Sequence, residues 1–204
     1  MKPINGMQGQ VIKSNAMPPV PVGNYVAKIM NAKVEPKTFP SGDTVEELVI
    51  QLDISEGAYK GYYKKMYEAT AGSQYGQKWK GVHRLRVPED NPNNEGAKWT
   101  YRQFANFIGC IEDSNPGYRW TWDEKSLKGL AIGIKVREFE WETDTGAGIS
   151  TEIGALCTVT DAKDPNVKNM KRRELKNKTA AAAAPAPAQA TLTPVEIPED
   201  EIPF

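Results

Sequence analysis

Residues 45–55 read VEELVIQLDIS, and this stretch gives the clearest indication of the fold class. Its large apolar side chains recur at every second position, at Leu48, Ile50, Leu52 and Ile54. A period of two is typical of a β-strand that has one face on a hydrophobic core. The stretch therefore predicts a strand, and with it a domain that is mainly β.

Other short patterns along the chain also predict strands, over residues 25–34, 61–70, 130–141 and 149–160. The turn-rich residues 143–148 predict a hairpin that joins the last two of these strands.

One segment has the spacing of a helix. Residues 100–111, TYRQFANFIGCI, repeat apolar side chains at helical intervals, and Thr100 is an available N-cap. The predicted order is three strands, a helix and two strands, with a long insertion at residues 71–98. We therefore expect an OB-fold, a five-stranded barrel with one helix between strands 3 and 4. Other small barrels and α+β sheets share this order, so it does not single out the OB-fold.

The charges cancel overall but are segregated along the 204 residues, which carry 26 basic and 26 acidic side chains. Residues 59–86 hold seven bases and one acid, a net charge of +6. Residues 163–178 hold seven bases and two acids, a net charge of +5, and residues 196–204 hold four acids and no base. Such runs are either solvated surface or binding regions for partners of opposite charge.

The composition divides the chain into four parts. We expect an N-terminal arm at residues 1–19 and one folded domain at residues 20–162. A basic and then Ala/Pro-rich disordered linker follows at residues 163–195, because TAAAAAPAPAQATLTP at 179–194 cannot form a packed core. Residues 196–204 form an acidic tail.

Several classes of protein are disfavoured by the composition. The chain has no run of about 18 apolar residues for a membrane span and no secretory signal, so we expect a cytoplasmic protein. Cys110 and Cys157 are too few for a disulfide scaffold, and we expect both to be buried in the core. The single histidine, His83, disfavours most metal and Ser/His/Asp chemistry and is interpreted as exposed or close to a phosphate.

Basic and aromatic side chains alternate on two of the predicted strands. One face of the third strand holds Tyr63, Lys65 and Tyr67. On the fourth strand, the face opposite Ile132, Ile134 and Val136 holds Lys135, Arg137, Phe139 and Trp141. The insertion adds Lys78, Trp79, Lys80, Arg84 and Arg86.

This mixture is typical of proteins that bind single-stranded nucleic acid, because cations follow the phosphates and ring faces stack on unpaired bases. The alternative is that the rings fill the barrel and the lysine stems extend past them. The assignment of faces also depends on the strand register, because a slip of one residue turns every side chain inward.

No motif indicates an enzyme. GSQYGQKW at residues 72–79 lacks the spacing of a phosphate-binding loop. The acidic pairs Glu46/Glu47 and Glu138/Glu140 could hold Mg²⁺ for a nuclease, but neither has a second acidic or histidine cluster at a motif spacing. We therefore expect no catalytic residue, cofactor or metal, with a metal-dependent nuclease as the less favoured alternative.

The chain ends with PVEIPEDEIPF at residues 194–204, in which an aromatic residue carries the free carboxylate. Its ring can fill an apolar pocket, its carboxylate can pair with a base, and the acids before it can meet a basic rim. We therefore expect a partner-binding tip at Glu199, Asp200, Glu201, Ile202, Pro203 and Phe204. An ordinary solubilising tail is the alternative.

At these residues the chain resembles the bacterial single-stranded DNA-binding proteins, which end in Asp/Glu-Ile-Pro-Phe after a disordered linker. The body resembles the phage-encoded branch at VPVGNYVAKI (20–29), GAYKG (57–61) and SLKGLAIGIK (126–135). The resemblance implies an OB-fold that binds single-stranded DNA without sequence specificity and protects it in replication, recombination or repair. The expected location is the cytoplasm, which is that of the bacterial host if the protein is phage-encoded.

The resemblance also implies that the tail recruits replication or recombination proteins. The long insertion at 71–98 departs from the host form, so a tetramer is not assumed and a homo-oligomer stays open. A different class is also left open, namely an adaptor whose barrel mainly binds protein.

Overall fold

The computed structural model describes residues 17–71, 77–88, 95–144 and 146–175. Its strands are β1 (Gly23–Thr38), β2 (Thr44–Ile54), β3 (Val82–Arg86), β4 (Ala131–Thr143) and β5 (Gly146–Cys157). Its helices are α1 (Tyr62–Ala69), α2 (Glu95–Ser114), the 3-10 turn η1 (Glu124–Leu127) and α3 (Val159–Lys163). The described part is mainly β, as the alternating patterns predict. The predicted acidic tip at residues 199–204 lies outside the described residues.

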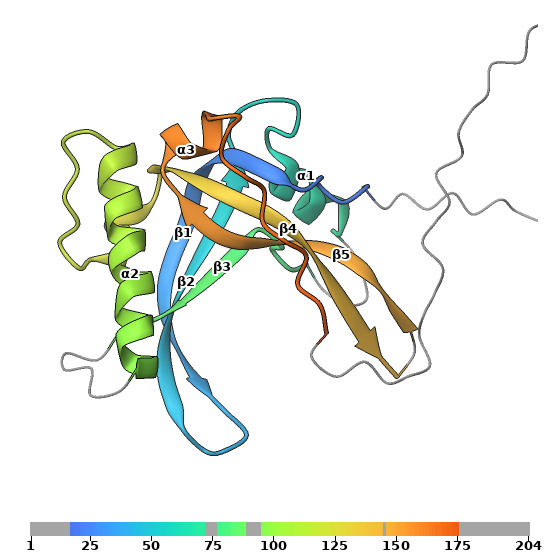
Figure 1. The fold of residues 1–204 in the computed structure, drawn as a ribbon, viewed down its shortest axis with the longest axis horizontal. Coiled ribbons are helices and arrows are strands. Elements are labelled where there is room, and N and C mark those ends of the chain that lie inside the picture. The colour runs from blue at the N-terminus through green and yellow to red at the C-terminus, as the bar shows by residue number, and fades with distance from the viewer. Residues whose placement is uncertain (1–16, 72–76, 89–94, 145, 176–204) are drawn as a thin grey trace, which may run out of the picture. The chain divides into compact units, whose positions relative to one another are not determined.

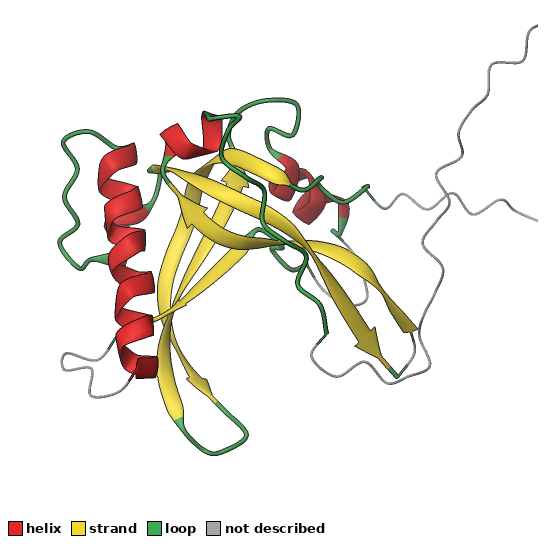
Figure 2. Ribbon diagram, viewed as in Figure 1, coloured by secondary structure: helices red, strands yellow, loops and turns green. Residues whose placement is uncertain are grey.

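The strands form one antiparallel sheet in the order β3-β2-β1-β4-β5 (Figures 1 and 2). Thr143 pairs with Gly146 at the end of β4 and β5, which confirms the predicted hairpin. The β1–β2 and β4–β5 hairpins both continue past the rest of the sheet, toward the bottom and the lower right of Figure 1.

The two edge strands of the sheet come close together. His83 Nδ1 on β3 lies 3.3 Å from the carbonyl oxygen of Ile153 on β5. Helix α2 contacts β3, β4 and β5, and it stands along the sheet in Figure 2. The sheet is therefore curled, with its edges facing each other rather than lying at opposite ends of a flat layer.

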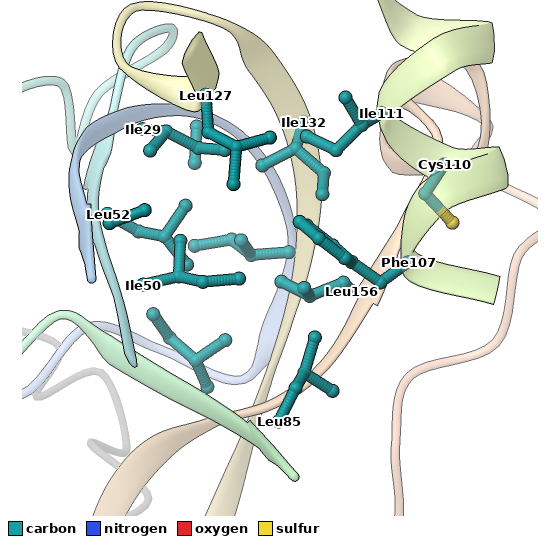
Figure 3. Packing of buried hydrophobic residues seen from close by; sticks show 14 of the residues in the cluster. Ile29, Ile50, Leu52, Leu85, Phe107, Cys110, Ile111, Leu127, Ile132 and Leu156 are labelled. Carbon is teal, nitrogen blue, oxygen red and sulfur yellow. The ribbon is translucent and has the colours of Figure 1, made fainter. Parts of the chain in front are cut away.

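The core lies inside this curled sheet, between the strands and α2 (Figure 3). The four alternating side chains of residues 45–55 are all buried in it, at Leu48, Ile50, Leu52 and Ile54. Ile132, Ile134 and Val136 on β4 are fully buried as well. Both predicted strand faces are thus confirmed.

Helix α2 confirms the helical pattern but is longer than residues 100–111. Phe104, Phe107 and Ile111 form its buried face. Thr100 is not the N-cap, because it lies inside the helix, where its hydroxyl donates to the carbonyl of Gly96 at 3.1 Å. Cys110 on α2 and Cys157 on β5 are both buried, as expected.

The predicted third strand at residues 61–70 is wrong, because Tyr62–Ala69 is helix α1. Tyr62 and Tyr63 are adjacent and both buried, at 5% exposure each, which a strand with one buried face does not allow. The backbone N–H of Tyr63 donates to the Asp53 carboxylate at 2.9 Å, so a residue of β2 holds the first turn of the helix. The true third strand is β3, inside the predicted insertion at 71–98.

The predicted domain boundary after residue 162 is too early, because the compact unit continues to Glu174. Arg173 pairs with the free edge of β4: its N–H donates to Glu138 at 2.9 Å, and its carbonyl accepts from Glu140 at 3.0 Å. Asn24 also donates to the carbonyl of Val167 at 3.0 Å. The first part of the predicted linker is therefore folded against the sheet. None of the helices described is long and apolar enough to cross a membrane.

Candidate nucleic-acid interface

Charged side chains lie on the outer face of β1, β2 and β3. Since Leu48 and Ile50 point into the core, Glu47 and Val49 point outward. The register aligns Lys33, Val49 and Arg84 in one row across the three strands. It aligns Glu35, Glu47 and Arg86 in the next row. Val49 is nevertheless only 3% exposed, consistent with the long side chains on either side covering it.

The two carboxylates on this face are held by cations. Glu47 Oε1 accepts a hydrogen bond from Lys37 Nζ at 2.9 Å. Arg84 Nη1 lies 3.6 Å from Glu47 Oε2 and 3.7 Å from Glu35 Oε2. Glu35 also pairs with Lys33, and the hydrogen bond from Lys33 holds the pKa of Glu35 below its ordinary value.

A shallow pocket of about 290 Å³ lies within this network, lined by Glu35, Pro36, Lys37, Glu47 and Arg84. Next to it, Arg86 is exposed, and its side chain has no ion-pair partner among the residues described. This face can therefore offer a phosphate one unpaired cation and several that are shared with carboxylates.

The outer face of the β4–β5 hairpin carries a second group. Arg137 Nη2 lies 2.9 Å from Glu152 Oε1, and Arg173 holds the same carboxylate with two hydrogen bonds of 2.8 Å. Partial burial opposes ionisation of Glu152, but the hydrogen bonds from Arg173 and Arg137 hold its pKa below the ordinary value. The guanidinium of Arg173 also lies 5.0 Å from the Phe139 ring. Two arginines thus share one carboxylate, which leaves a net positive charge.

Trp141 and Lys135 complete this face of β4. Trp141 is 39% exposed and lies against Gly148, where a side chain would come within 3.0 Å of the ring. Lys135 is half-buried, and its ammonium has no ion-pair partner in the part of the chain that is described. The predicted outward orientation of Lys135, Arg137, Phe139 and Trp141 is consistent with the burial of Ile132, Ile134 and Val136 on the other face.

His83 lies at the seam between the two groups, and its interpretation as an exposed residue is wrong. Its ring is partly buried between β3 and β5. Burial lowers its pKa, although the contact with Ile153 and the charge of Glu152 oppose that shift. His83 therefore joins the edge strands instead of facing the solvent.

Among the predicted site residues of α1 and the segment after it, the aromatic rings pack on the protein and the lysines are exposed. Tyr63 is in the core, so its predicted place on a binding face is wrong. Trp79 donates from Nε1 to the carbonyls of Leu52 and Gly81, at 3.0 and 3.1 Å, and its ring lies 5.7 Å from that of Tyr67. Both rings thus pack on the body of the protein. Lys65, Lys78 and Lys80, which are close to Tyr67 and Trp79 in the sequence, are exposed.

Sequence reasoning missed the contributions of β1 and of the segment after α3. The charged residues Lys33, Glu35 and Lys37 occupy every second position of β1, which continues to Thr38 and so passes the predicted end at residue 34. This alternation in the sequence could have indicated the longer strand. Arg173 had no such signal, because its pairing with β4 joins residues far apart in the chain.

Exposed aromatic rings also lie on and after α2. Trp99, Tyr101 and Trp122 are 61%, 53% and 67% exposed. Trp122 stacks on Trp120, with ring centroids 5.1 Å apart, and has a positive φ of 65°. Trp99 and Tyr101 lie on α2, and Trp122 lies between α2 and η1.

No family model matches the chain, and the comparison with curated proteins finds none that is similar in sequence.

Proposed function

We propose that this protein is an OB-fold protein that binds single-stranded DNA with little regard to sequence and protects it during replication, recombination or repair. The strand order is the observation that carries the proposal. The antiparallel sheet β3-β2-β1-β4-β5 has α2 between β3 and β4 and has β3 close to β5. This arrangement supports the proposal, because an OB-fold barrel is built with the same order of strands and helix.

OB-folds bind oligonucleotides on the face of strands 2 and 3 and on the loops between strands 1 and 2 and between strands 4 and 5. In this chain the corresponding face carries Arg84, Arg86 and Lys33, and both hairpins extend beyond it. Long basic side chains there would follow the phosphates, while Phe39 and Trp141, which are 37% and 39% exposed, would offer ring faces to bases.

The binding proposal includes no catalytic step. Two of the acidic residues considered for a nuclease have basic partners: Glu47 pairs with Lys37, and Glu138 with Arg172. These ion pairs favour a non-catalytic role for both carboxylates. Incubation with labelled single-stranded DNA and Mg²⁺ tests this directly, because shortened products would favour a nuclease.

We propose further that the acidic tip at residues 199–204 recruits replication or recombination proteins. The acids at 199–201 and the apolar ring of Phe204 support this role. Replacement of Phe204 by alanine should abolish capture of such partners and leave the affinity for DNA intact. Unchanged capture would show that the tip is only a solubilising tail.

The main test compares oligo-dT with duplex DNA of equal length. We expect tight binding of oligo-dT that weakens with salt, by about 0.7 in log affinity per neutralised phosphate for each tenfold change in salt. Equal affinity for the duplex at moderate salt would refute the proposal.

An adaptor that binds protein is the second candidate, favoured by the exposed rings of Trp99, Tyr101 and Trp122. Tryptophan fluorescence discriminates the two. Quenching by oligo-dT supports stacking of bases on exposed rings, whereas an unchanged spectrum supports the adaptor.

A further inference from the structure

The pocket on the outer face of β1 to β3 contains a carboxylate oxygen that accepts no hydrogen bond from any described residue. Glu47 is only 8% exposed, and its Oε2 has no hydrogen-bond partner among the described residues. Its other oxygen, Oε1, is held by Lys37 at 2.9 Å. A buried carboxylate oxygen without a donor is costly, which makes it an unusual feature to find on a binding face.

Arg84 is the ion-pair partner nearest to this oxygen. Its Nη1 lies 3.6 Å from Glu47 Oε2, which is beyond hydrogen-bond length, and its side chain is 52% exposed. Arg84 is therefore held loosely between Glu35 and Glu47 and is free to turn toward a phosphate. A turn of Arg84 away from Glu47 would leave Glu47 Oε2 without its ion-pair partner and available to a donor in the pocket.

We propose that this pocket takes one unpaired nucleobase with an exocyclic amino group, and that Glu47 Oε2 accepts a hydrogen bond from that amino group. The inference rests on the proposed binding of single-stranded DNA. A carboxylate accepts from the N4 amino group of cytosine, and adenine presents a similar donor at N6. Thymine and uracil present a carbonyl oxygen at the equivalent position, which a carboxylate repels.

The size and lining of the pocket suit a single base. A volume of about 290 Å³ lies at the lower limit of small-molecule sites. Pro36 supplies an apolar wall for a ring face, and Arg84 and Lys37 supply cations for the adjoining phosphates. Binding elsewhere on the face stays tolerant of sequence, so the pocket adds a modest preference at one position.

The test compares oligo-dC with oligo-dU, which carry an amino group and a carbonyl at the same ring position. We expect the wild-type protein to bind oligo-dC more tightly by about fivefold, the lower range for one good base contact. In Glu47→Gln, the amide oxygen stays with Lys37 and the amide N–H₂ faces the pocket. That variant should lose or reverse the preference, because it now offers a donor to the uracil O4.

Glu138→Gln is the matched control. It removes one negative charge from β4, outside the pocket, where the carboxylate pairs with Arg172. The ratio of affinities for oligo-dC and oligo-dU should therefore stay as in the wild type. An oligonucleotide of N4,N4-dimethylcytosine, which has no amino N–H, tests the wild-type protein without any variant and should bind about as weakly as oligo-dU.

The outcomes separate the two proposals. Equal binding of oligo-dC and oligo-dU by the wild type, or the same ratio in Glu47→Gln, would overturn the pocket and leave DNA binding intact. No binding of either oligonucleotide would overturn the proposed function, and the pocket with it.

Discussion

The replacement Arg86→Ala tests which cations on the β1–β3 face meet DNA. Arg86 is exposed at the end of β3, opposite Glu47 in the register, and has no ion-pair partner among the described residues. A phosphate can therefore bind it without first breaking an ion pair. Loss of this cation should remove one phosphate contact and leave the backbone hydrogen bonds between β3 and β2 intact.

The expected effect is a change in salt dependence. One phosphate contact contributes about 0.7 to the slope of log affinity against log salt. Between about 50 mM and about 200 mM salt, the loss of affinity should therefore be about 2.6-fold smaller for Arg86→Ala than for the wild type. Fluorescence anisotropy with labelled oligo-dT at several salt concentrations measures both slopes.

Arg173→Ala is the matched control. The side chain of Arg173 is 46% exposed, but two hydrogen bonds already hold it to Glu152. Its replacement should leave the salt slope within error of the wild type. An unchanged slope in Arg86→Ala, or an equal fall in both variants, would refute the assignment of the β1–β3 face as the DNA path.

Stability measurements test the rest of the structure. Arg173→Ala should lower the free energy of unfolding by about 1–2 kcal/mol in urea titration, because it loses the Glu152 pair and the contact with Phe139. Phe107→Ala should cost about 3–5 kcal/mol, because the ring is 1% exposed; a loss below about 1 kcal/mol would contradict that packing. Burial lowers the pKa of His83 from 6.5, so folding disfavours its protonation. Stability should then be full above pH 6.5 and decline as the pH falls below it, and His83→Gln should flatten that decline in unfolding curves.

The periodic spacing of apolar residues was enough to predict several elements of this fold. The period-two patterns of β2 and β4 and the helical spacing of α2 appear in the sequence because each element buries one face, and burial selects apolar residues at a fixed interval. The outward placement of Arg137, Phe139 and Trp141 follows from the same alternation. These features need no knowledge of what lies across the core.

Other features depended on partners distant in the chain. Tyr62–Ala69 is a helix because Asp53 on β2 holds its first turn and both leading tyrosines enter the core. β3 has only five residues, too few for a clear pattern, and it is fixed by pairing with β2. Arg173 joins the edge of β4 through backbone hydrogen bonds that any residue type except proline could make.

Some features of the candidate site could also be predicted from the sequence, and others depended on the tertiary structure. The order of residues by itself showed that basic and aromatic side chains alternate over residues 135–141 and that residues 196–204 are acidic. Tertiary structure decided that Tyr63 and Trp79 pack inward, that Arg173 shares Glu152 with Arg137, and that Glu47 keeps a carboxylate oxygen without a donor. The physical reason is that ion pairs and burial depend on which strands lie side by side. The spacing of residues within one strand does not show which strands pair with it.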